Sequence, residues 1–376
     1  MTAGRTDVVV VGAGVVGAAI ARELVLAGHH VHVLERAFPA GGTTAAGMGH
    51  IVVMDDSPAQ LALTAHSRAL LLGLAAELSD GCELDRTGTL WVAEDVDQMR
   101  GVAAKRELLA AHGVASEVLD GHALAEAEPE LRAGLPGALR VPDDVVVYPP
   151  GFARWLLDSV AGPRLRVSSG VEVTGFAAHT ALTSDGPIRG DVVVNAAGAR
   201  AAQLTPELPV VPRKGHLVIT DRHPGFCRHQ LAELGYLKSA HTMSAESVAF
   251  NVQPRRTGQL LIGSSRELVG WDPSINRGLL RRMLARALEF LPGLARLSAI
   301  RTWTGFRPAT EDKLPLIGRW DAVPGLWIAA GHEGLGITTA LGTAELLGDL
   351  MLGRTGVLDP APYAAARVNP AAAATA

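Results

Sequence analysis

Residues 7–28 have the sequence DVVVVGAGVVGAAIARELVLAG. The run of four valines predicts a strand buried within a parallel sheet, and the apolar segment after the glycines predicts a helix. Gly12, Gly14 and Gly17 connect these two elements with the spacing GxGxxG. We expect Gly12 to permit a tight turn, Gly14 to let a pyrophosphate approach the backbone, and Gly17 to let the helix pack close to the strand.

A second strand and an acidic residue follow this turn. Residues 31–34 predict another buried strand, and Glu35 comes directly after it. A carboxylate there would accept hydrogen bonds from an adenosine ribose, while the start of the helix attracts phosphates through its free N–H groups. The pattern therefore predicts a dinucleotide site. The alternatives are a glycine turn packed in an ordinary α/β core and, for Glu35, a surface carboxylate at a strand end.

The overall composition narrows the classes of function. The chain has 376 residues and a formal net charge of -4, which gives no electrostatic reason to expect a nucleic-acid partner or an anionic membrane. Glycine makes up 42 of the 376 residues, about 11% against a usual figure of roughly 7%. This excess indicates either many turns or places where the backbone approaches a ligand closely.

Cysteine usage and hydropathy bear on cofactors and location. Cys82 and Cys227 are the only cysteines and form no CxxC arrangement, so we expect no disulfide framework, metal site or iron–sulfur cluster within this chain. The longest apolar stretch, 8–21, is interrupted by glycines and is shorter than the ~18 residues of a membrane span. The N-terminus also lacks a basic region followed by a cleavable apolar segment. The sequence therefore predicts a cytoplasmic protein without a transmembrane segment.

Three more segments favour FAD over NAD as the dinucleotide. Residues 37–50 form a loop of small and hydroxyl-bearing residues, where an NAD enzyme would normally continue into another strand and helix. Residues 191–199 predict a buried strand that runs into a turn, and residues 325–351 predict a strand, a glycine loop and an apolar helix. Strand-to-turn segments scattered over the chain in this way could surround one long ligand.

At this point the sequence resembles FAD-dependent oxidoreductases of the D-amino-acid oxidase type, which include glycine oxidase, sarcosine oxidase and D-amino-acid dehydrogenases. The resemblance covers almost the whole chain. It rests on the N-terminal fingerprint, TTAAGMG at 43–49, VVNAAG at 193–198, GFRPAT at 305–310 with PLIG at 315–318, and GHEGLG at 331–336. Segments 44–58 and 231–241 look most like the flavin β-subunits of D-hydroxyproline dehydrogenase, with the hydrogen cyanide synthase and opine oxidase β-subunits as close relatives.

The resemblance implies an α/β fold, in which a Rossmann-like FAD-binding domain of the glutathione-reductase type carries an inserted α+β substrate domain on a mostly antiparallel sheet. The expected FAD-binding domain comprises residues 1–85, 142–208 and 309–362. The expected substrate domain comprises 86–141 and 209–308, and 363–376 would be a flexible tail. Within these limits the sequence predicts helices at 57–78 and 275–290 and a hairpin at 249–264.

The resemblance also implies a set of FAD-binding residues. They are Gly12, Ala13, Gly14, Val15, Val16, Gly17, Glu35, Arg36, Thr43, Thr44, Ala46, Gly47, Met48, Val171, Ala197, Gly198, Gly331, His332, Gly334, Leu335, Gly336, Ile337 and Thr338. The backbone of Val171 would meet adenine, unless Val171 is an ordinary strand residue. A helix that starts near Gly336 would stabilise negative charge on reduced flavin. His332 and Glu333 could contribute, or His332 could be a turn residue bonded to backbone.

Arg307 is the expected substrate-binding residue. It lies at a predicted strand end, where its guanidinium can hold a carboxylate through two parallel hydrogen bonds, and the corresponding arginine of similar family members takes the amino-acid carboxylate. The alternative is an ion pair with Glu311 or Asp312.

Three other segments supply expected pocket residues. Asn251 and Gln253 share a strand face, and an amide at Asn251, where glycine oxidase has a tyrosine, could recognise a ring hydroxyl, the alternative being cross-strand hydrogen bonds. His50, and less strongly Tyr236 and His241, are further pocket candidates that could instead be packed polar residues.

The resemblance implies hydride transfer from Cα of a small D-amino or imino acid, such as D-hydroxyproline or D-proline, to flavin N5, with no general base. We expect noncovalent FAD, because the segment after Arg307 lacks the cysteine that anchors FAD in sarcosine oxidases. We also expect weak oxygen reactivity, because Leu261 stands where sarcosine oxidases have a lysine near the flavin. Hetero-oligomers with FAD and iron–sulfur subunits are expected from the subgroup relatives. The rival hypotheses are a glycine or sarcosine-type oxidase, an NAD-dependent dehydrogenase, and a flavin-binding assembly subunit without its own chemistry.

Overall fold

The valine run forms the centre of a six-stranded sheet in the computed structural model, which describes residues 6–235 and 246–368. The strand order is β18 (Leu316–Arg319), β19 (Leu326–Ala330), β12 (Val192–Asn195), β1 (Val8–Val11), β2 (Val31–Glu35) and β8 (Leu165–Ser169). All neighbouring strands are parallel except β18 and β19. The carboxyl ends of β1, β2, β12 and β19 therefore meet at one edge, which brings the turns after these strands together.

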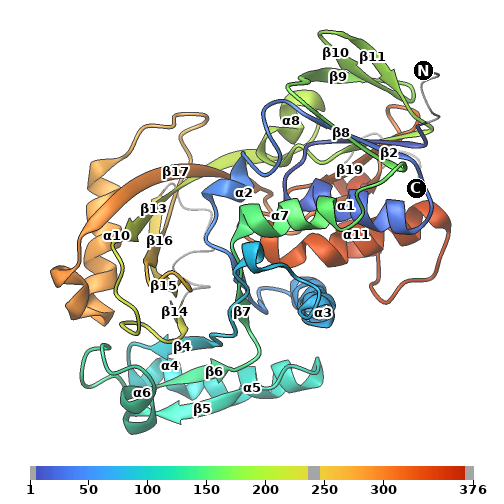
Figure 1. Cartoon of the computed structure of the whole chain (residues 1–376). Coiled ribbons are helices and arrows are strands. Elements are labelled where there is room, and N and C mark those ends of the chain that lie inside the picture. The colour runs from blue at the N-terminus through green and yellow to red at the C-terminus, as the bar shows by residue number, and fades with distance from the viewer. Residues whose placement is uncertain (1–5, 236–245, 369–376) are drawn as a thin grey trace.

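Helices pack around this sheet, as Figure 1 shows. Helix α1 (Val15–Leu26) contacts α11 (Gly336–Leu352) and α7 (Pro149–Asp158), and α11 also contacts α3 (Pro58–Leu74). Their buried faces and the sheet share one apolar core. Helix α3 begins next to Ser57, whose Oγ accepts a hydrogen bond from the Gln60 N–H at 3.1 Å, so the predicted start is confirmed and the helix ends four residues earlier than predicted.

The second large sheet has eight strands, and the predicted mostly antiparallel sheet is confirmed. Its order is β17 (Ala299–Ala309), β13 (Val211–Thr220), β16 (Leu260–Glu267), β15 (Glu246–Pro254), β14 (Gln230–Glu233), β4 (Thr89–Ala93), β6 (Gly137–Val141) and β5 (Glu117–Asp120). Only β14 and β4 pair in parallel. Strands β15 and β16 form the predicted hairpin.

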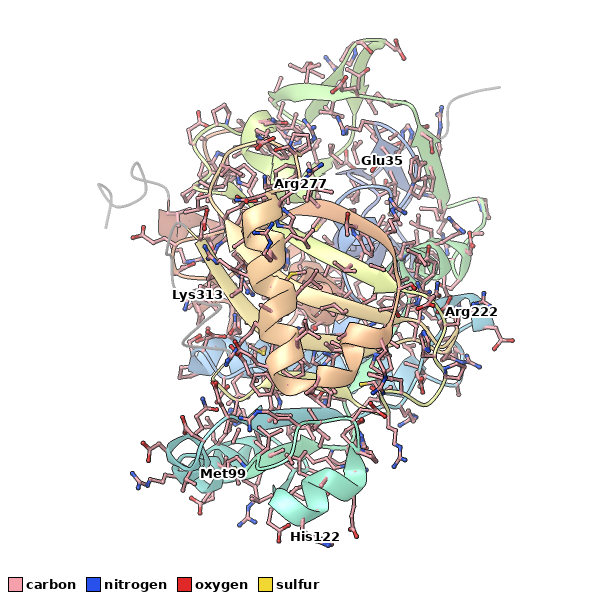
Figure 2. All side chains as sticks on the ribbon, turned by 90° about the vertical axis from the view of Figure 1, so that its left-hand side faces the viewer. Glu35, Met99, His122, Arg222, Arg277 and Lys313 are labelled. Atoms are coloured by element: carbon pink, nitrogen blue, oxygen red, sulfur yellow. The ribbon has the colours of Figure 1, made fainter. Side chains whose placement is uncertain are left out.

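One face of the eight-stranded sheet is covered by α10 (Arg277–Phe290), which lies in front of the sheet in Figure 2 with Arg277 at its upper end. The Phe290 and Phe250 rings stack with their centroids 4.3 Å apart. Asn276 caps this helix by accepting a hydrogen bond from the Leu279 N–H at 3.1 Å, one residue after the predicted start. The other face of the sheet is turned toward the six-stranded sheet.

Smaller elements complete the described chain. They are α2 (Thr43–Ala46), α4 (Val96–Arg100), α5 (Val102–Ala111), α6 (Gly121–Ala127) and α8 (Ala201–Leu204), the two-stranded β3 (His50–Ile51) and β7 (Val145–Val146), the three-stranded β9 (Val173–Ala177), β10 (Thr180–Thr183) and β11 (Gly186–Arg189), and five short 3-10 turns. None of the helices in the described ranges has both the length and the apolar character that a membrane crossing requires. The domain boundaries themselves stay a prediction.

The predicted flexible tail from residue 363 is wrong for its first residues. Tyr363 is only 1% exposed, and its hydroxyl donates a hydrogen bond to the Ala59 carbonyl at 2.5 Å. Arg367 forms an ion pair with Asp312 at 2.8 Å. Although it is rich in alanine, this segment packs against α3 and the loop before β18 through one aromatic and one charged side chain. Residues 369–376 lie outside the described chain.

Candidate active site

A cavity of about 1040 Å³ lies between the carboxyl edge of the six-stranded sheet and the uncovered face of the eight-stranded sheet. Most of the predicted FAD-binding residues line it: Gly12, Gly14, Val15, Val16, Glu35, Arg36, Thr43, Thr44, Ala46, Gly47, Met48, Val171, Ala197, Gly198, His332, Gly334, Leu335, Gly336 and Ile337. Ala13, Gly17, Gly331 and Thr338 are not among its lining residues. This volume is at the upper end of the range for small-molecule pockets.

The glycine turn after β1 is packed too tightly for side chains. Gly12 has φ +106°, and a Cβ on it would lie 2.6 Å from the Ala196 carbonyl oxygen. A Cβ on Gly17 would lie 2.0 Å from the Gly12 carbonyl oxygen. Gly17 therefore packs against the backbone of the turn and does not line the cavity. The backbone of α1 is thereby held against the end of β1, with its N-terminal N–H groups at the cavity.

Glu35 stiffens this turn from the neighbouring strand. Its Oε2 accepts a hydrogen bond from the Ala13 N–H at 2.9 Å, and its Oε1 accepts one from the Ala37 N–H at 3.0 Å. The Val171 N–H donates a hydrogen bond to the Glu35 carbonyl at 3.0 Å. Because that N–H is already used, Val171 can offer its carbonyl group to an adenine. Contact of Glu35 with a ribose stays a prediction.

Two cations lie at the same end of the cavity. Arg36 and Arg200 both line the wall, and the Arg200 guanidinium lies 4.8 Å from the centroid of the Trp271 ring. Burial and the charge of Arg36 lower the pKa of Arg200. Sequence analysis did not predict Arg200 or Trp271 as part of the site. The positive charges of Arg36 and Arg200 make this end of the cavity favourable for anionic groups.

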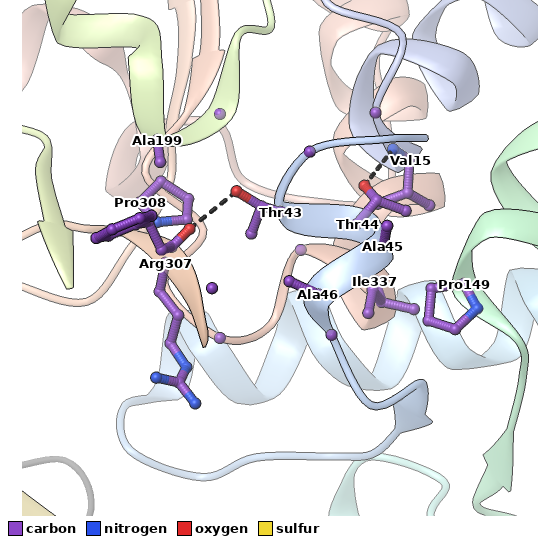
Figure 3. A pocket seen from close by; sticks show the side chains of 18 of the residues that line it. Val15, Thr43, Thr44, Ala45, Ala46, Pro149, Ala199, Arg307, Pro308 and Ile337 are labelled. Carbon is purple, nitrogen blue, oxygen red and sulfur yellow. Dashed lines mark hydrogen bonds between the residues drawn. The ribbon is translucent and has the colours of Figure 1, made fainter. Parts of the chain in front are cut away.

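The loop that contains α2 is tied to both sheets. Thr44 Oγ1 accepts a hydrogen bond from the Val15 N–H at 3.0 Å, and Thr43 Oγ1 donates one to the Phe306 carbonyl at 2.8 Å (Figure 3). On the other side of the loop, the Trp303 indole N–H donates to the Ala46 carbonyl at 3.3 Å. The two threonines of the predicted loop thus connect α1 with β17 across the cavity.

Gln253 does not occupy its predicted place. It is not among the described residues that line the cavity, and its Nε2 donates to the Met48 carbonyl at 3.1 Å. Asn251 does line the cavity, and its Oδ1 accepts a hydrogen bond from Gln230 Nε2 at 2.6 Å. The shared strand face was therefore not sufficient, because the α2 loop covers Gln253 and leaves Asn251 at the cavity.

The loop between β19 and α11 brings a helix start to the cavity. Gly336 and Ile337 begin α11 and line the wall, while the Thr338 hydroxyl donates to the His50 carbonyl at 2.9 Å instead. Gly331 has φ +83° and makes the turn after β19. The partial positive charge of the helix start therefore faces the cavity.

Both predicted histidines line the cavity as neutral side chains. A hydrogen bond joins His332 Nε2 to Thr343 Oγ1 at 3.0 Å, and burial lowers the pKa of His332 to about 4. His50 is held in a similar way, by a hydrogen bond between its Nε2 and Thr89 Oγ1 at 2.8 Å, and burial lowers the pKa of His50 to about 3. For His332, the alternative of a turn residue bonded to backbone differs from the structure, in which its partner is the Thr343 side chain of α11. Tyr236 and His241 lie outside the described residues.

A buried ion cluster borders the same loop. Glu333 Oε1 lies 3.5 Å from Arg213 Nη1 on β13 and 3.5 Å from Arg266 Nε on β16. The Glu333 N–H donates to the Pro308 carbonyl at 2.8 Å, although its φ of 49° is unusual for a residue with a side chain. The cluster locks the glycine loop onto the eight-stranded sheet. Arg213 and Arg266 carried no motif, so sequence reasoning missed them.

Arg307 extends into the cavity from β17 (Figure 3). Its Nη1 donates to the Ser265 carbonyl on β16 at 3.0 Å. Asp312, one of the alternative ion-pair partners, pairs with Arg367 instead. Leu217 on β13, Leu261 on β16 and Trp303, on the same strand as Arg307, also line the wall.

The residues present fit an FAD molecule. Glycines leave room for a ligand beside the backbone, two helix starts and two arginines suit phosphate and ring charge, and the cavity is long enough to involve both sheets. Within the described ranges, no group of three or more His, Cys, Asp or Glu side chains is arranged to hold a metal ion.

Comparison with known proteins decides the family. The family model described as FAD dependent oxidoreductase, named DAO, matches residues 7–350. The chain belongs to the DAO family. The predicted family, fold and FAD cofactor are thereby confirmed, and the NAD-dependent alternative is wrong.

Relatives of this DAO-family protein align over nearly their full length. Glycine oxidase of Pseudomonas aeruginosa is 34% identical, over 96% of this chain and 98% of the relative. Hydrogen cyanide synthase subunit HcnC of the same organism is 30% identical, over 98% of each chain. The crystal structure of glycine oxidase from Geobacillus kaustophilus superposes with a TM-score of 0.85 at 28% identity, covering 96% of this chain and 99% of that one. The DAO-family protein is therefore an FAD-dependent oxidoreductase acting on CH–NH or CH–NH2 donors.

Proposed function

We propose that the protein oxidises the C–N bond of a small D-amino or imino acid, with D-hydroxyproline and D-proline as the expected substrates. The observation that supports it is Arg307, which projects into the cavity among apolar side chains. When bound, FAD supplies a two-electron acceptor for the hydride that leaves the substrate Cα, while the amine lone pair forms the C=N bond of the imino product.

Arg307 would hold the substrate carboxylate. A guanidinium presents parallel N–H donors in a rigid plane, and its hydrogen bond to the Ser265 carbonyl at 3.0 Å fixes that plane. Arg213, its cross-strand partner on β13, lies against Glu333, which reduces the repulsion between the two like charges. A bound carboxylate would therefore be oriented and not merely attracted.

The surrounding residues suit a small ring. Leu217, Leu261 and Trp303 provide apolar surface that excludes water from the amine carbon. The Asn251 amide oxygen is committed to Gln230, so its NH2 group is the donor that Asn251 can offer to a ring hydroxyl. Burial lowers the pKa of His50 to about 3 and that of His332 to about 4, so neither imidazole would retain a proton taken from the substrate amine at neutral pH, in accord with oxidation of a neutral amine without a general base.

The FAD would be held by the glycine turn, the α2 loop and the start of α11, without a covalent bond. We expect acid precipitation to leave all the yellow flavin in the supernatant. A yellow pellet would mean that a covalent link exists. Leu261 lines the cavity where sarcosine oxidases carry a lysine, so we also expect the reduced protein to react slowly with oxygen.

A glycine or sarcosine-type oxidase that uses oxygen is the second candidate. The 34% identity to the P. aeruginosa glycine oxidase favours it. Reduction of an artificial electron acceptor by glycine, sarcosine, D-proline and D-hydroxyproline gives the kcat/KM of each substrate and so separates the two substrate classes. Oxygen consumption with the best of the four then separates an oxidase from a dehydrogenase.

One experiment tests the proposal directly. The purified chain is expected to show a flavin absorbance band that D-hydroxyproline bleaches in the absence of oxygen. A flavin band that a panel of D-amino and imino acids fails to bleach would favour an assembly subunit without its own chemistry.

We also propose a hetero-oligomer with FAD and iron–sulfur subunits. One relative at 30% identity is by name a subunit of hydrogen cyanide synthase. Affinity purification from the native host, followed by iron analysis, is expected to recover such partners. Full activity of the lone chain with its physiological acceptor would contradict this.

A further inference from the structure

Strand β13 carries a glycine at the point where the Arg307 side chain crosses it. A Cβ on Gly215 would lie 2.2 Å from Arg307 Nη1 and 2.8 Å from Arg307 Cζ. The guanidinium therefore occupies the space that a side chain on Gly215 would fill. It starts on β17, passes over β13 and donates to the Ser265 carbonyl on β16.

Backbone conformation does not require a glycine at this position. Gly215 is absent from the residues with positive φ, and its register partner on β17 is Gly305. The three atoms nearest to such a Cβ all belong to the end of the Arg307 side chain. An alanine would thus fit the strand, and the guanidinium would have to move.

Gly305, directly opposite, has a different neighbour. A Cβ there would lie 2.5 Å from the Ala46 Cβ in the α2 loop. Two paired glycines on one sheet face therefore make room for different groups, one for the proposed substrate arginine and one for the cofactor loop. This contrast assigns Gly215 to the substrate side.

We propose that Gly215 is a positioning residue for substrate binding, which acts by letting Arg307 reach the Ser265 carbonyl and present a fixed guanidinium plane to a carboxylate. This inference rests on the proposed function of Arg307 as the carboxylate-binding residue. It concerns carboxylate affinity and orientation, and it leaves FAD binding to other residues.

The test is Gly215→Ala in the FAD-loaded protein. The probe is pyrrole-2-carboxylate, which resembles proline but has no Cα–H to lose, and its binding is followed by the change in flavin absorbance. We expect its Kd to rise roughly tenfold to a hundredfold, because a charge-assisted hydrogen bond loses its geometry. The KM of an oxidised substrate should rise similarly, with flavin content and melting temperature unchanged.

Two further variants keep the result interpretable. Gly175→Ala on β9 is the matched control, since the nearest atom to its Cβ would be Leu182 Cδ1 at an ordinary 4.0 Å, and its Kd is expected to match the parent. In the Arg307→Ala background, Gly215→Ala is expected to change the Kd by less than about twofold, because both substitutions remove the same interaction.

The outcomes separate this inference from the proposed function. An unchanged Kd in Gly215→Ala, or additive effects in the double variant, would overturn the role of Gly215 even if D-hydroxyproline is oxidised. Conversely, a protein that oxidises no D-amino or imino acid but binds the probe, and loses that binding in Gly215→Ala, would retain the positioning role and reject the substrate.

Discussion

The glycine turn after β1 and the cavity face of the eight-stranded sheet enclose the same space but are built differently. In the turn, the groups that face the cavity are backbone atoms, and Gly12 and Gly17 are required because a Cβ would collide with backbone oxygens. On the sheet face, the groups are side chains such as Arg266 and Arg307, and Gly215 leaves room for one of them.

This difference determines how substitutions act. A Cβ in the turn meets backbone, which cannot move without separating α1 from β1, so the fold itself should fail. A Cβ on the sheet face meets the end of a flexible side chain, so the fold should survive while binding changes. The following predictions test that distinction, beginning with the largest expected effect.

Gly17→Ala should destroy the turn, because its Cβ would lie 2.0 Å from the Gly12 carbonyl oxygen. We expect a loss of at least about 4 kcal/mol in the free energy of unfolding, together with loss of flavin. Urea unfolding and flavin absorbance measure these. Gly73→Ala in α3, with nothing within 4 Å of its Cβ, is the control and should stabilise by about 0.5 to 1 kcal/mol. A flavin-loaded, stable Gly17→Ala protein would show that the turn can relax.

Arg307→Ala should leave the fold and flavin content intact but lower kcat/KM by roughly a hundredfold to a thousandfold, because a charged, oriented contact with the substrate carboxylate is lost. Arg307→Lys should recover only part of this, since an ammonium cannot bind a carboxylate through a planar fork. Steady-state kinetics and the flavin spectrum give both quantities. Loss of flavin with normal substrate affinity would place Arg307 on the cofactor side instead.

His332 should make stability depend on pH. Its pKa is about 4 in the folded chain and near 6.5 when unfolded, so the unfolded chain binds more protons between these values and stability falls as the pH falls through them. We expect a loss of about 2 kcal/mol between pH 7 and pH 5 from this residue. Urea titrations of His332→Asn should show a flatter dependence, while His122→Asn, at a side chain 83% exposed, should match the parent. Equal slopes in all three would reject this origin.

Gln253→Leu should have the smallest effect, since it removes one hydrogen bond to the Met48 carbonyl, worth about 1 kcal/mol. FAD affinity, measured by fluorescence on cofactor release, should fall roughly fivefold with substrate KM unchanged. Thr257→Ala, in the turn of the same hairpin, is the control. A selective rise in KM would restore Gln253 to the substrate pocket.

The parts of the molecule that sequence analysis predicted well are those carried by contiguous backbone. The valines of β1, the glycine turn and Glu35 are close in sequence, and their spacing follows from the geometry of a strand, a turn and a helix. The two helices predicted to start at residues 57 and 275 begin next to Ser57 and Asn276, within one residue of the prediction, because the signals that start a helix are also local in sequence.

The sheet face could not be predicted in the same way. Arg213, Arg266 and Glu333 come from β13, β16 and the loop after β19, yet they are in contact. Their spacing in the sequence gives no indication of this contact. Gln253 was misplaced because its environment depends on the α2 loop, about 200 residues away in the chain. Arg307 was predicted from its place at a strand end together with the resemblance, whereas its crossing over Gly215 became apparent only from the strand register.

The cavity between the two sheets also links cofactor supply to protein lifetime. FAD would contact turns on one sheet and strands on the other, so its binding energy would be shared by both halves of the chain. At a free FAD concentration of 100 times Kd, this adds about 2.7 kcal/mol to the free energy of unfolding. In a cell short of flavin, the protein without FAD would unfold more often and be degraded sooner by proteases. The amount of enzyme would therefore rise and fall with the supply of the vitamin from which FAD is made.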